Sequence, residues 1–329
     1  MDDIFETKIP LKFRNGEFRI LCVSDIHGGV GYDEKNTVKD LEALLDCCSP
    51  DLVLLLGDTA GPGCIHVENT AQLKNMLDGL SSPMEKRGIP WAHVFGNHDN
   101  NFGVDNRDAE PVYESYAHCV SKSGDESLPG CGNYALPVYS GDGKDIIYAV
   151  YALDSHRGDD VFKARYGLPE NEKIVLPNRG GIDSSERGVD FAQVEYYSKL
   201  SDAFRKKQGK TVPAMMVMHV PVQEFAFAGE NPDECGLSGD KGEEISCQCL
   251  NSGIFRACVE KGDVKMMCFG HDHENNCIAE YCGIVMAYDG YLSCHASHNE
   301  LTKGGRLTVI NESDPEKFTT EFIRVRDIR

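Results

Sequence analysis

Three short apolar segments near the N-terminus each end in a cluster of polar residues, and this arrangement limits the fold more than any other feature. Residues 18–24, 52–56 and 91–95 predict buried strands, and helical apolar spacing at 38–47 and 67–80 separates them. Alternating strands and helices at this spacing are typical of parallel βαβ units. Because the carboxyl ends of parallel strands meet at one edge of a sheet, where open α/β sheets bind ligands, we expect the polar clusters to meet there.

The rest of the chain predicts further strands, fewer helices and two long loops. Residues 154–188 and 224–249 are polar and rich in glycine, and loops of this length inside a compact domain are more often functional than idle. We find no repeat or linker, so we expect one domain over residues 1–329, with a motif-bearing core at about 17–300 and C-terminal strands at 305–326. The other predicted strands are 134–139, 146–153, 214–218, 264–269, 278–287 and 306–325, and the other predicted helices are 191–204 and 251–259.

The composition is that of a globular protein able to bury a core, with 41% hydrophobic and 26% charged residues. The net charge of −20 opposes nonspecific binding to nucleic acid polymers and anionic membranes, so we expect neither as a partner. No apolar run approaches the ~18 residues that span a bilayer, and residues 1–20 show no secretory signal. We therefore expect a cytoplasmic protein. An anionic substrate would need strong local positive charge, which metal ions would supply.

The 14 cysteines do not predict disulfides, because a chain of this length without a secretory signal is expected in a reducing compartment. Cys22 and Cys268 lie in apolar runs and are expected to be buried as small hydrophobic residues. Cys235, Cys247 and Cys249 lie in a polar loop and could bind zinc. However, a lone C-x-C lacks the paired C-x-x-C spacing of structural zinc sites, so this alternative is not favoured.

Five predicted strand ends carry polar side chains that can bind metals, which turn chemistry alone hardly explains. Imidazole, carboxylate and amide oxygen, without thiolate, suit Mn, Fe or Zn. Apart from His98 and Asp99, these clusters hold four histidines, two aspartates and an asparagine, which exceed the needs of one ion. We therefore expect two ions, with Asp58 as the shared carboxylate because it stands alone on its strand end. The clusters are Asp25 with His27, Asp58, Asn97 with His98 and Asp99, His219, and His271 with His273.

In this order, the motifs D-x-H, G-D, G-N-H-D, a lone H and G-H-x-H resemble those of the calcineurin-like metallophosphoesterases, over about three quarters of the chain. The resemblance implies an α/β fold, a four-layer αββα sandwich of two mixed β-sheets flanked by helices, with a dinuclear centre at the strand ends. It implies that His98 is the acid for the leaving group, held by Asp99. The implied ligands are Asp25, His27, Asp58 and His273 for one ion, and Asp58, Asn97, His219 and His271 for the other.

Residues 251–255 and 262–264 are similar to one branch of this family, which includes small plant purple-acid-phosphatase-like proteins and fungal cell-cycle-regulating phosphatases. The chain departs from purple acid phosphatases because Gly57-Asp58-Thr59-Ala60-Gly61 lacks their tyrosine ligand. It departs from protein Ser/Thr phosphatases because residues 61–64 lack the arginine that grips the phosphate there. These departures speak against a purple charge-transfer colour and weaken the case for phosphoprotein substrates.

The expected activity is hydrolysis of phosphomonoesters by attack of a hydroxide that bridges the two ions, with His98 as general acid. The substrate would be a phosphate ester, either a small molecule or a phosphoprotein. The alternative among enzymes is a phosphodiesterase acting on small or cyclic nucleotide diesters. The alternative of another class is a catalytically silent scaffold, which is expected to lack ligands, whereas here every ligand position is filled. The substrate, the native metal pair and the oligomeric state stay open.

A few other polar residues permit both a functional and a structural interpretation. Residues 154–157 follow a strand and could touch substrate, although a surface turn is favoured. His295 and His298 could line the cleft, and residues 179–181 could supply a phosphate grip, with a solvated loop as the alternative. Three further histidines are interpreted as ordinary core or surface residues: His66, His93 and His118.

Overall fold

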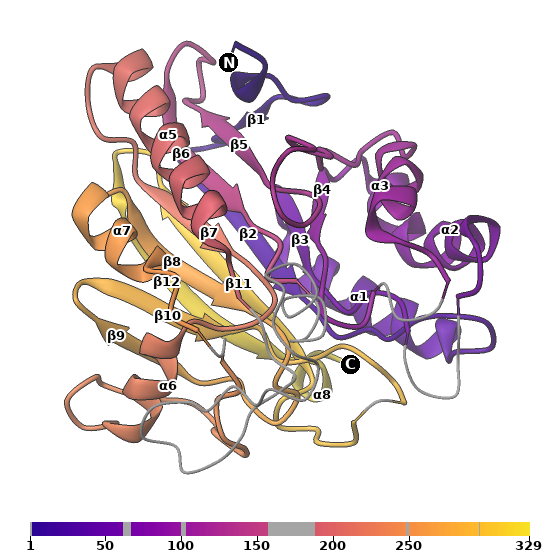
Figure 1. Ribbon diagram of the computed structural model, residues 1–329. Coiled ribbons are helices and arrows are strands. Elements are labelled where there is room, and N and C mark those ends of the chain that lie inside the picture. The colour runs from indigo at the N-terminus through magenta and orange to yellow at the C-terminus, as the bar shows by residue number, and fades with distance from the viewer. Residues whose placement is uncertain (1, 62–66, 100–102, 157–187, 248–249, 296) are drawn as a thin grey trace, which may run out of the picture.

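Two mixed β-sheets lie face to face and carry helices on their outer faces, which makes the four-layer αββα sandwich (Figure 1). The computed structural model describes residues 2–61, 67–99, 103–156, 188–247, 250–295 and 297–329. Within these ranges, no helix is both long and apolar enough to cross a bilayer. The predicted fold class is confirmed.

The five-stranded sheet contains the three N-terminal strands, in the order β12-β11-β2-β3-β4. β2 (Glu17–Val23), β3 (Leu52–Leu56) and β4 (Trp91–Val94) run parallel, as their alternation with helices predicted. The hairpin of β11 (Gly304–Asn311) and β12 (Asp314–Arg324) joins antiparallel to β2. The carboxyl ends of β2, β3 and β4 therefore share one edge of the sheet.

The seven-stranded sheet has the order β1-β5-β6-β7-β8-β10-β9, and its four middle strands from β6 to β10 run parallel. The outer pairs β5/β6 and β9/β10 are antiparallel hairpins. The strands are β1 (Leu11–Lys12), β5 (Tyr134–Tyr139), β6 (Ile146–Ala152), β7 (Ala214–Val217), β8 (Val264–Phe269), β9 (Ile278–Tyr281) and β10 (Ile284–Tyr288).

A buried apolar layer fills the space between the sheets. Ile20 and Leu54 enter it from the five-stranded sheet, and Val150 and Met266 enter it from the seven-stranded sheet. Two further apolar clusters lie under the helices on the outer faces. The helices are α1 (Glu34–Cys48), α2 (Thr70–Arg87) and α3 (Asn106–Glu114) on the five-stranded sheet, α5 (Phe191–Gln208), α6 (Gln223–Glu230) and α7 (Ile254–Lys261) on the other, and the short η1 (Asp2–Phe5) and α8 (Val325–Ile328) near the termini.

Helix α2 is longer than the predicted helix at 67–80. It begins at Asn69, whose side chain accepts the backbone N–H of Gln72 as an N-cap. It ends at Gly88, whose φ of 65° is the left-handed conformation that favours glycine. Pro83 lies inside the helix, and the buried Met84 continues its apolar face beyond residue 80. Packing of this face on the sheet outweighs the hydrogen bond that proline removes.

Sequence reasoning missed α3 and α6, as well as the short helices η1 and α8 near the termini. The prediction of a long loop at 224–249 is wrong at its start, because α6 occupies Gln223–Glu230. This helix is too short to show clear periodicity, and tertiary contacts hold it. The ring of Phe225 is buried and lies 4.9 Å from that of Tyr288 and 5.7 Å from that of Phe269, measured between ring centroids. Most of the other predicted loop, 154–188, lies outside the described residues.

The interpretation of His93 as a core histidine is confirmed, and the residue carries a buried ion pair. Its Nε2 lies 3.2 Å from Oε2 of Glu110, and both side chains are only 1% exposed. Burial alone would lower the pKa of His93, but the Glu110 carboxylate and the neighbouring Cys119 together outweigh this effect and raise the pKa from 6.5 to about 10. The pair therefore ties β4 to α3. His66 lies outside the described residues, and His118 forms a partly exposed pair with Glu85.

We predict that His93→Leu lowers the free energy of unfolding by about 3–5 kcal/mol at pH 6, because it leaves the Glu110 carboxylate buried without a cation. Because the pKa of His93 is raised in the folded state, its protonation stabilises the fold fully at pH values below the unfolded pKa of 6.5. This contribution is lost as the pH rises through about 10. Urea unfolding of the wild type and of His93→Leu at pH 6 and pH 10 measures the difference in their free energies of unfolding. This difference should be smaller at pH 10.

The matched control is His118→Leu, which removes the more exposed His118–Glu85 pair of 2.9 Å. Exposed pairs typically contribute about 0–1 kcal/mol, so this variant should unfold nearly like the wild type. Equal destabilisation by both variants, or a His93 effect that is the same at both pH values, would contradict the buried ion pair.

Candidate metal centre

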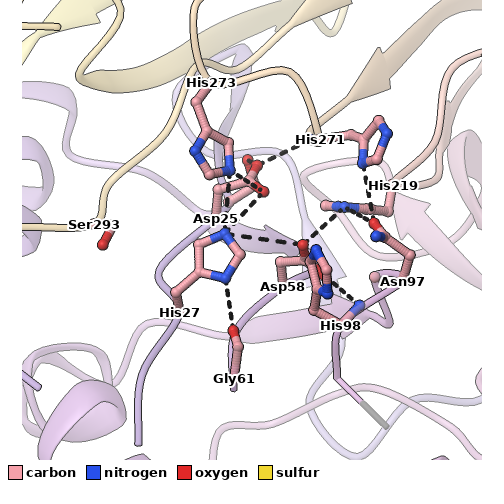
Figure 2. Close-up of polar contacts among 12 residues, drawn as sticks. Asp25, His27, Asp58, Gly61, Asn97, His98, His219, His271, His273 and Ser293 are labelled. Atoms are coloured by element: carbon pink, nitrogen blue, oxygen red, sulfur yellow. Dashed lines mark hydrogen bonds and ion pairs between the residues drawn. The ribbon is translucent and has the colours of Figure 1, made fainter. Parts of the chain in front are cut away.

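Side chains from five strand ends converge at the edge where the carboxyl ends of both sheets meet (Figure 2). Asp58 and Asp25 lie in the middle of this group, and histidines surround them. The residues that converge are Asp25 and His27 after β2, Asp58 after β3, Asn97 and His98 after β4, His219 after β7, and His271 and His273 after β8. The predicted meeting of the clusters at one edge is thus what the structure shows.

The turns that follow these strands place several site residues in the left-handed backbone region. The φ angles are 52° for Asp25, 51° for His27, 49° for Asp58 and 85° for His271. Such a conformation costs residues with a Cβ atom of order 1 kcal/mol or more, and it concentrates at functional sites. A Cβ on Gly96 would collide with the Asp58 carboxylate, so glycine is required for this close approach. The backbone is therefore bent so that the strand ends direct side chains into one space.

Asp25, His27 and His273 form the first group of donors. Nε2 of His27 lies 3.1 Å from Nε2 of His273, and Oδ1 of Asp25 lies 3.1 Å from the same His273 atom. The ligand atoms of these three residues all lie within 4.8 Å of one another, so one cation could contact them all. Two imidazole nitrogens facing each other at this distance share at most one proton, and a cation between them would replace it.

His219, Asn97 and His271 form the second group, beside Asp58. Oδ1 of Asn97 lies 3.0 Å from Nε2 of His219 and 3.0 Å from Nδ1 of His271. Oδ2 of Asp58 lies 3.4 Å from Nε2 of His219. These atoms are imidazole nitrogens and oxygens, the donor types that suit Mn, Fe or Zn.

Asp58 lies between the two groups, as expected for a shared ligand. Its Oδ2 faces Nε2 of His219 at 3.4 Å and Nε2 of His27 at 3.9 Å, so one oxygen lies near both groups. Its Oδ1 accepts the backbone N–H of His98 at 2.8 Å. Asp25 also lies within 4.8 Å of Asp58 and His219, so both aspartates lie near the boundary of the two groups.

Main-chain carbonyls set the tautomers of two histidines. Nδ1 of His27 donates to the carbonyl of Gly61 at 2.6 Å, and Nδ1 of His219 donates to that of Leu56 at 2.7 Å. The Nε2 atoms point into the centre and carry the lone pairs when the rings are neutral. Burial alone would lower the pKa of His219, but the Asp58 and Asp25 carboxylates outweigh it and raise this pKa, so Nε2 of His219 holds a proton that a bound cation would replace. A histidine held by a carbonyl on its outer nitrogen is the usual arrangement of a metal ligand. This observation fits a metal at each group.

The electrostatic field favours the charged forms that bind cations. Burial alone would raise the pKa of Asp25 and of Asp58, but the neighbouring His273 and His219 respectively outweigh it and lower both pKa values. Both groups are therefore carboxylates at neutral pH. Within the described residues, the groups that could hold a metal ion are these Asp/His groups, and Cys235 and Cys247 belong to none. Cys249 lies outside the described residues.

His98 lies at the edge of the centre, next to Asp58 (Figure 2). Burial lowers the pKa of His98, and the Asp58 carboxylate acts in the opposite direction. A weakly held proton is donated readily but is present in a smaller fraction of molecules. Asp99 accepts the backbone N–H groups of Gly96 at 2.7 Å and Ala60 at 2.8 Å. These bonds join the loops after β3 and β4, so Asp99 holds the backbone around His98.

The prediction of a surface turn after β6 is wrong, because Asp154, Ser155 and His156 are buried. Nε2 of His156 lies 2.8 Å from Oε1 of Gln193, whose Nε2 donates to the main-chain oxygen of Asp154 at 2.7 Å. Helix α5 thus covers this turn, which the local sequence does not reveal. Residue 157 and residues 179–181 lie outside the described residues.

His295 lies beside the centre, and His298 is exposed. Nδ1 of His295 is 3.3 Å from Oγ of Ser293, whose backbone N–H donates to the carbonyl of Asp25 at 3.1 Å. Sequence reasoning did not single out Ser24 and Asp289, which contact each other behind Asp25. The available signals were weak: Ser24 precedes the D-x-H motif directly, and an Asp-Gly pair ends β10.

A family model described as calcineurin-like phosphoesterase matches residues 18–275. The chain belongs to this family. "Probable inactive purple acid phosphatase 14" from Arabidopsis thaliana is 26% identical over 311 residues, covering 85% of this chain and 72% of that protein. "Phosphatase DCR2" from Saccharomyces cerevisiae is 26% identical over 296 residues, covering 81% of this chain and 45% of that protein. The predicted resemblance is confirmed.

The solved structures that share the fold include the following two. The structure of a dimetal phosphatase from Danio rerio has a TM-score of 0.52 at 13% identity, covering 92% of this chain and 98% of that one. That of "GAP50 the anchor in the inner membrane complex of Plasmodium" has a TM-score of 0.55 at 11% identity, covering 96% of this chain and 87% of that one. At these identities the likeness shows the fold alone.

We predict that the purified chain binds about two Mn²⁺ or Zn²⁺ ions, and that Asp58→Asn weakens both sites because a shared carboxylate is lost. Metal content after dialysis, measured by plasma mass spectrometry, tests this. The matched control is Asp51→Asn, since Asp51 lies just before β3 and Asp58 lies just after it. Unchanged metal content in Asp58→Asn, or equal loss in Asp51→Asn, would refute Asp58 as a ligand.

Proposed function

We propose that this protein is a dinuclear metal-dependent phosphatase that hydrolyses phosphomonoesters. The observation that carries the proposal is the pair of donor groups that meet at Asp58, with the Nε2 atoms of His27 and His219 directed inward. Asp25, His27, Asp58 and His273 would hold one ion, and Asp58, Asn97, His219 and His271 would hold the other. Two such ions supply a water of lowered pKa and neutralise charge on the phosphoryl oxygens.

The roles of the remaining residues follow from their positions. His98 lies beside Asp58 at the edge of the centre and would give a proton to the oxygen of the leaving group (Figure 2). Asp99 would keep the loop of His98 in place through its two backbone hydrogen bonds. The chain carries a net charge of −20, so the substrate phosphate would be attracted only near the bound cations.

Named relatives include both a phosphatase and proteins called inactive, so family membership alone does not decide activity. A catalytically silent scaffold has no reason to retain a full set of donors. In this chain every expected ligand is present and directed into one space, with two histidines held in the ligand tautomer. This supports an active enzyme.

The deciding experiment compares turnover of p-nitrophenyl phosphate and bis-p-nitrophenyl phosphate by the full chain loaded separately with Mn²⁺, Zn²⁺ and Fe²⁺. Asp51→Asn serves as the folded control and Asp58→Asn as the variant that loses the centre. The proposal is supported if the wild type and Asp51→Asn turn over the monoester and Asp58→Asn does not. Preference for the diester would make the protein a phosphodiesterase. Two bound metals without any turnover would make it a scaffold.

We predict that His98→Ala lowers turnover of an alkyl phosphate by about 10²–10⁴-fold, because the poor leaving group needs a proton. Turnover of p-nitrophenyl phosphate should fall much less, since p-nitrophenolate leaves without protonation. Metal content should stay at the wild-type value, because His98 is not a proposed ligand. An equal loss for both substrates, with metal retained, would be inconsistent with His98 as the general acid.

A further inference from the structure

Behind the candidate centre, the hydroxyl of Ser24 lies between two fully buried carboxylates. Its Oγ is 2.6 Å from Oδ2 of Asp25 and 2.7 Å from Oδ1 of Asp289, and all three residues have 0% exposure. Ser24 follows β2 in the five-stranded sheet, and Asp289 follows β10 in the seven-stranded sheet. This contact therefore crosses from one sheet to the other.

The two short contacts of the Ser24 hydroxyl need one more proton than a serine side chain provides. A hydroxyl donates one hydrogen, and an ionised carboxylate donates none. With both carboxyl groups ionised, one of the two short oxygen–oxygen contacts would have no proton in it, and two like charges would face each other in a dry core. A further oxygen, the carbonyl of Gly290, lies 3.2 Å from the same hydroxyl and is also only an acceptor. One of the two acids must therefore hold a proton.

The surroundings place that proton on Asp289. Oδ2 of Asp25 already accepts the backbone N–H of His271 at 2.9 Å, and its Oδ1 faces the His273 imidazole. Asp289 makes no ion pair within the part of the chain that the structure describes, and its Oδ2 has no hydrogen-bond partner there. A buried carboxylate without a cation is costly, whereas a neutral acid with one unpaired carbonyl oxygen costs much less.

Burial and two of the neighbouring groups agree with this assignment. Burial raises the pKa of Asp289 well above its ordinary value, and the neighbouring Cys268 and Asp25 act in the same direction. The buried guanidinium of Arg306 donates to the main-chain oxygens of Tyr288 and Asn276, both at 2.6 Å. These hydrogen bonds engage Arg306 with the backbone, while its charge, His219 and the Ser24 hydrogen bond act against protonation of Asp289. The assignment therefore rests on the geometry of the two short contacts at Ser24.

We propose that Asp289 is a protonated positioning residue, which donates to Ser24 so that Ser24 donates to Asp25. The proposal rests on the proposed role of Asp25 as a metal ligand. Through this chain of hydrogen bonds, Oδ2 of Asp25 is held toward the protein and Oδ1 is directed at His273 and the proposed ion. Gly270 makes the close packing possible, because a Cβ there would come within 2.7 Å of the Ser24 hydroxyl.

The protonation state is tested by infrared difference spectroscopy of the wild type and Asp289→Asn at pH 7, with and without Mn²⁺. The wild type should show the carbonyl stretch of one protonated carboxylic acid that the variant lacks, in both metal states. A spectrum in which the substitution removes only a carboxylate band would overturn the proposal.

The positioning role is tested by calorimetric titration of metal-stripped full-length chains with Mn²⁺. Ser24→Ala should raise the dissociation constant about 10–100-fold, the usual effect of losing a hydrogen bond to a metal ligand. Asp289→Leu should weaken binding in the same direction. Asp289→Asn should stay within about threefold of the wild type, because its amide N–H donates to Ser24 in place of the acid. Asp289→Asn binding as weakly as Asp289→Leu would overturn the proposal.

The matched control is Ser81→Ala, which removes a buried serine hydroxyl from α2 and should leave Mn²⁺ affinity unchanged. Thermal unfolding establishes that each variant is folded. Neither readout uses phosphatase turnover, so the two proposals fail separately. A chain with the infrared band and the expected affinities, but without turnover, would refute the phosphatase alone. A chain that hydrolyses monoesters without these signatures would refute the positioning role alone.

Discussion

The candidate centre depends on the way the Asp25 carboxylate is held between two separate sheets. Asp25 follows β2, yet one of its oxygens accepts the backbone N–H of His271, which follows β8 in the other sheet. Its main-chain carbonyl accepts the N–H of Ser293, from the segment after β10. The apolar layer between the sheets fixes their separation, and close packing makes that separation stiff. The distance between the two donor groups is therefore a property of the core, rather than of the loops that carry the ligands.

Sequence patterns predicted the fold where local chemistry decides structure. The strands at 52–56, 134–139 and 264–269 have the predicted bounds, because largely apolar runs begin there after aspartate or asparagine and end before glycine or serine. The same patterns failed where contacts between distant segments determine the local structure. Helix α6 is held by aromatic packing on β8 and β10, and His156 is buried because Gln193 of α5 covers it.

In the candidate site, too, the sequence predicted some residues and not others. Each proposed ligand lies within four residues after a strand, and residue type with position was enough to single it out. Ser24 and Asp289 could not be recognised, because their significance comes from a contact between residues 265 positions apart. An Asp-Gly pair after a strand is an ordinary turn signal. Only the three-dimensional arrangement shows that this aspartate faces a hydroxyl that is bonded to another acid.

The wide separation of the ligands along the chain has a consequence for biosynthesis. Asp25 and His271 are 246 positions apart, and contacts of such long range form late in folding. An emerging chain that has passed residue 99 already presents both aspartates and His27, but it lacks His219, His271 and His273. Metal captured at that stage would meet an open half-site that water can enter and leave. The proposed centre is complete only after β8 has joined the second sheet, so the order of synthesis would delay firm binding of metal there until the core is assembled.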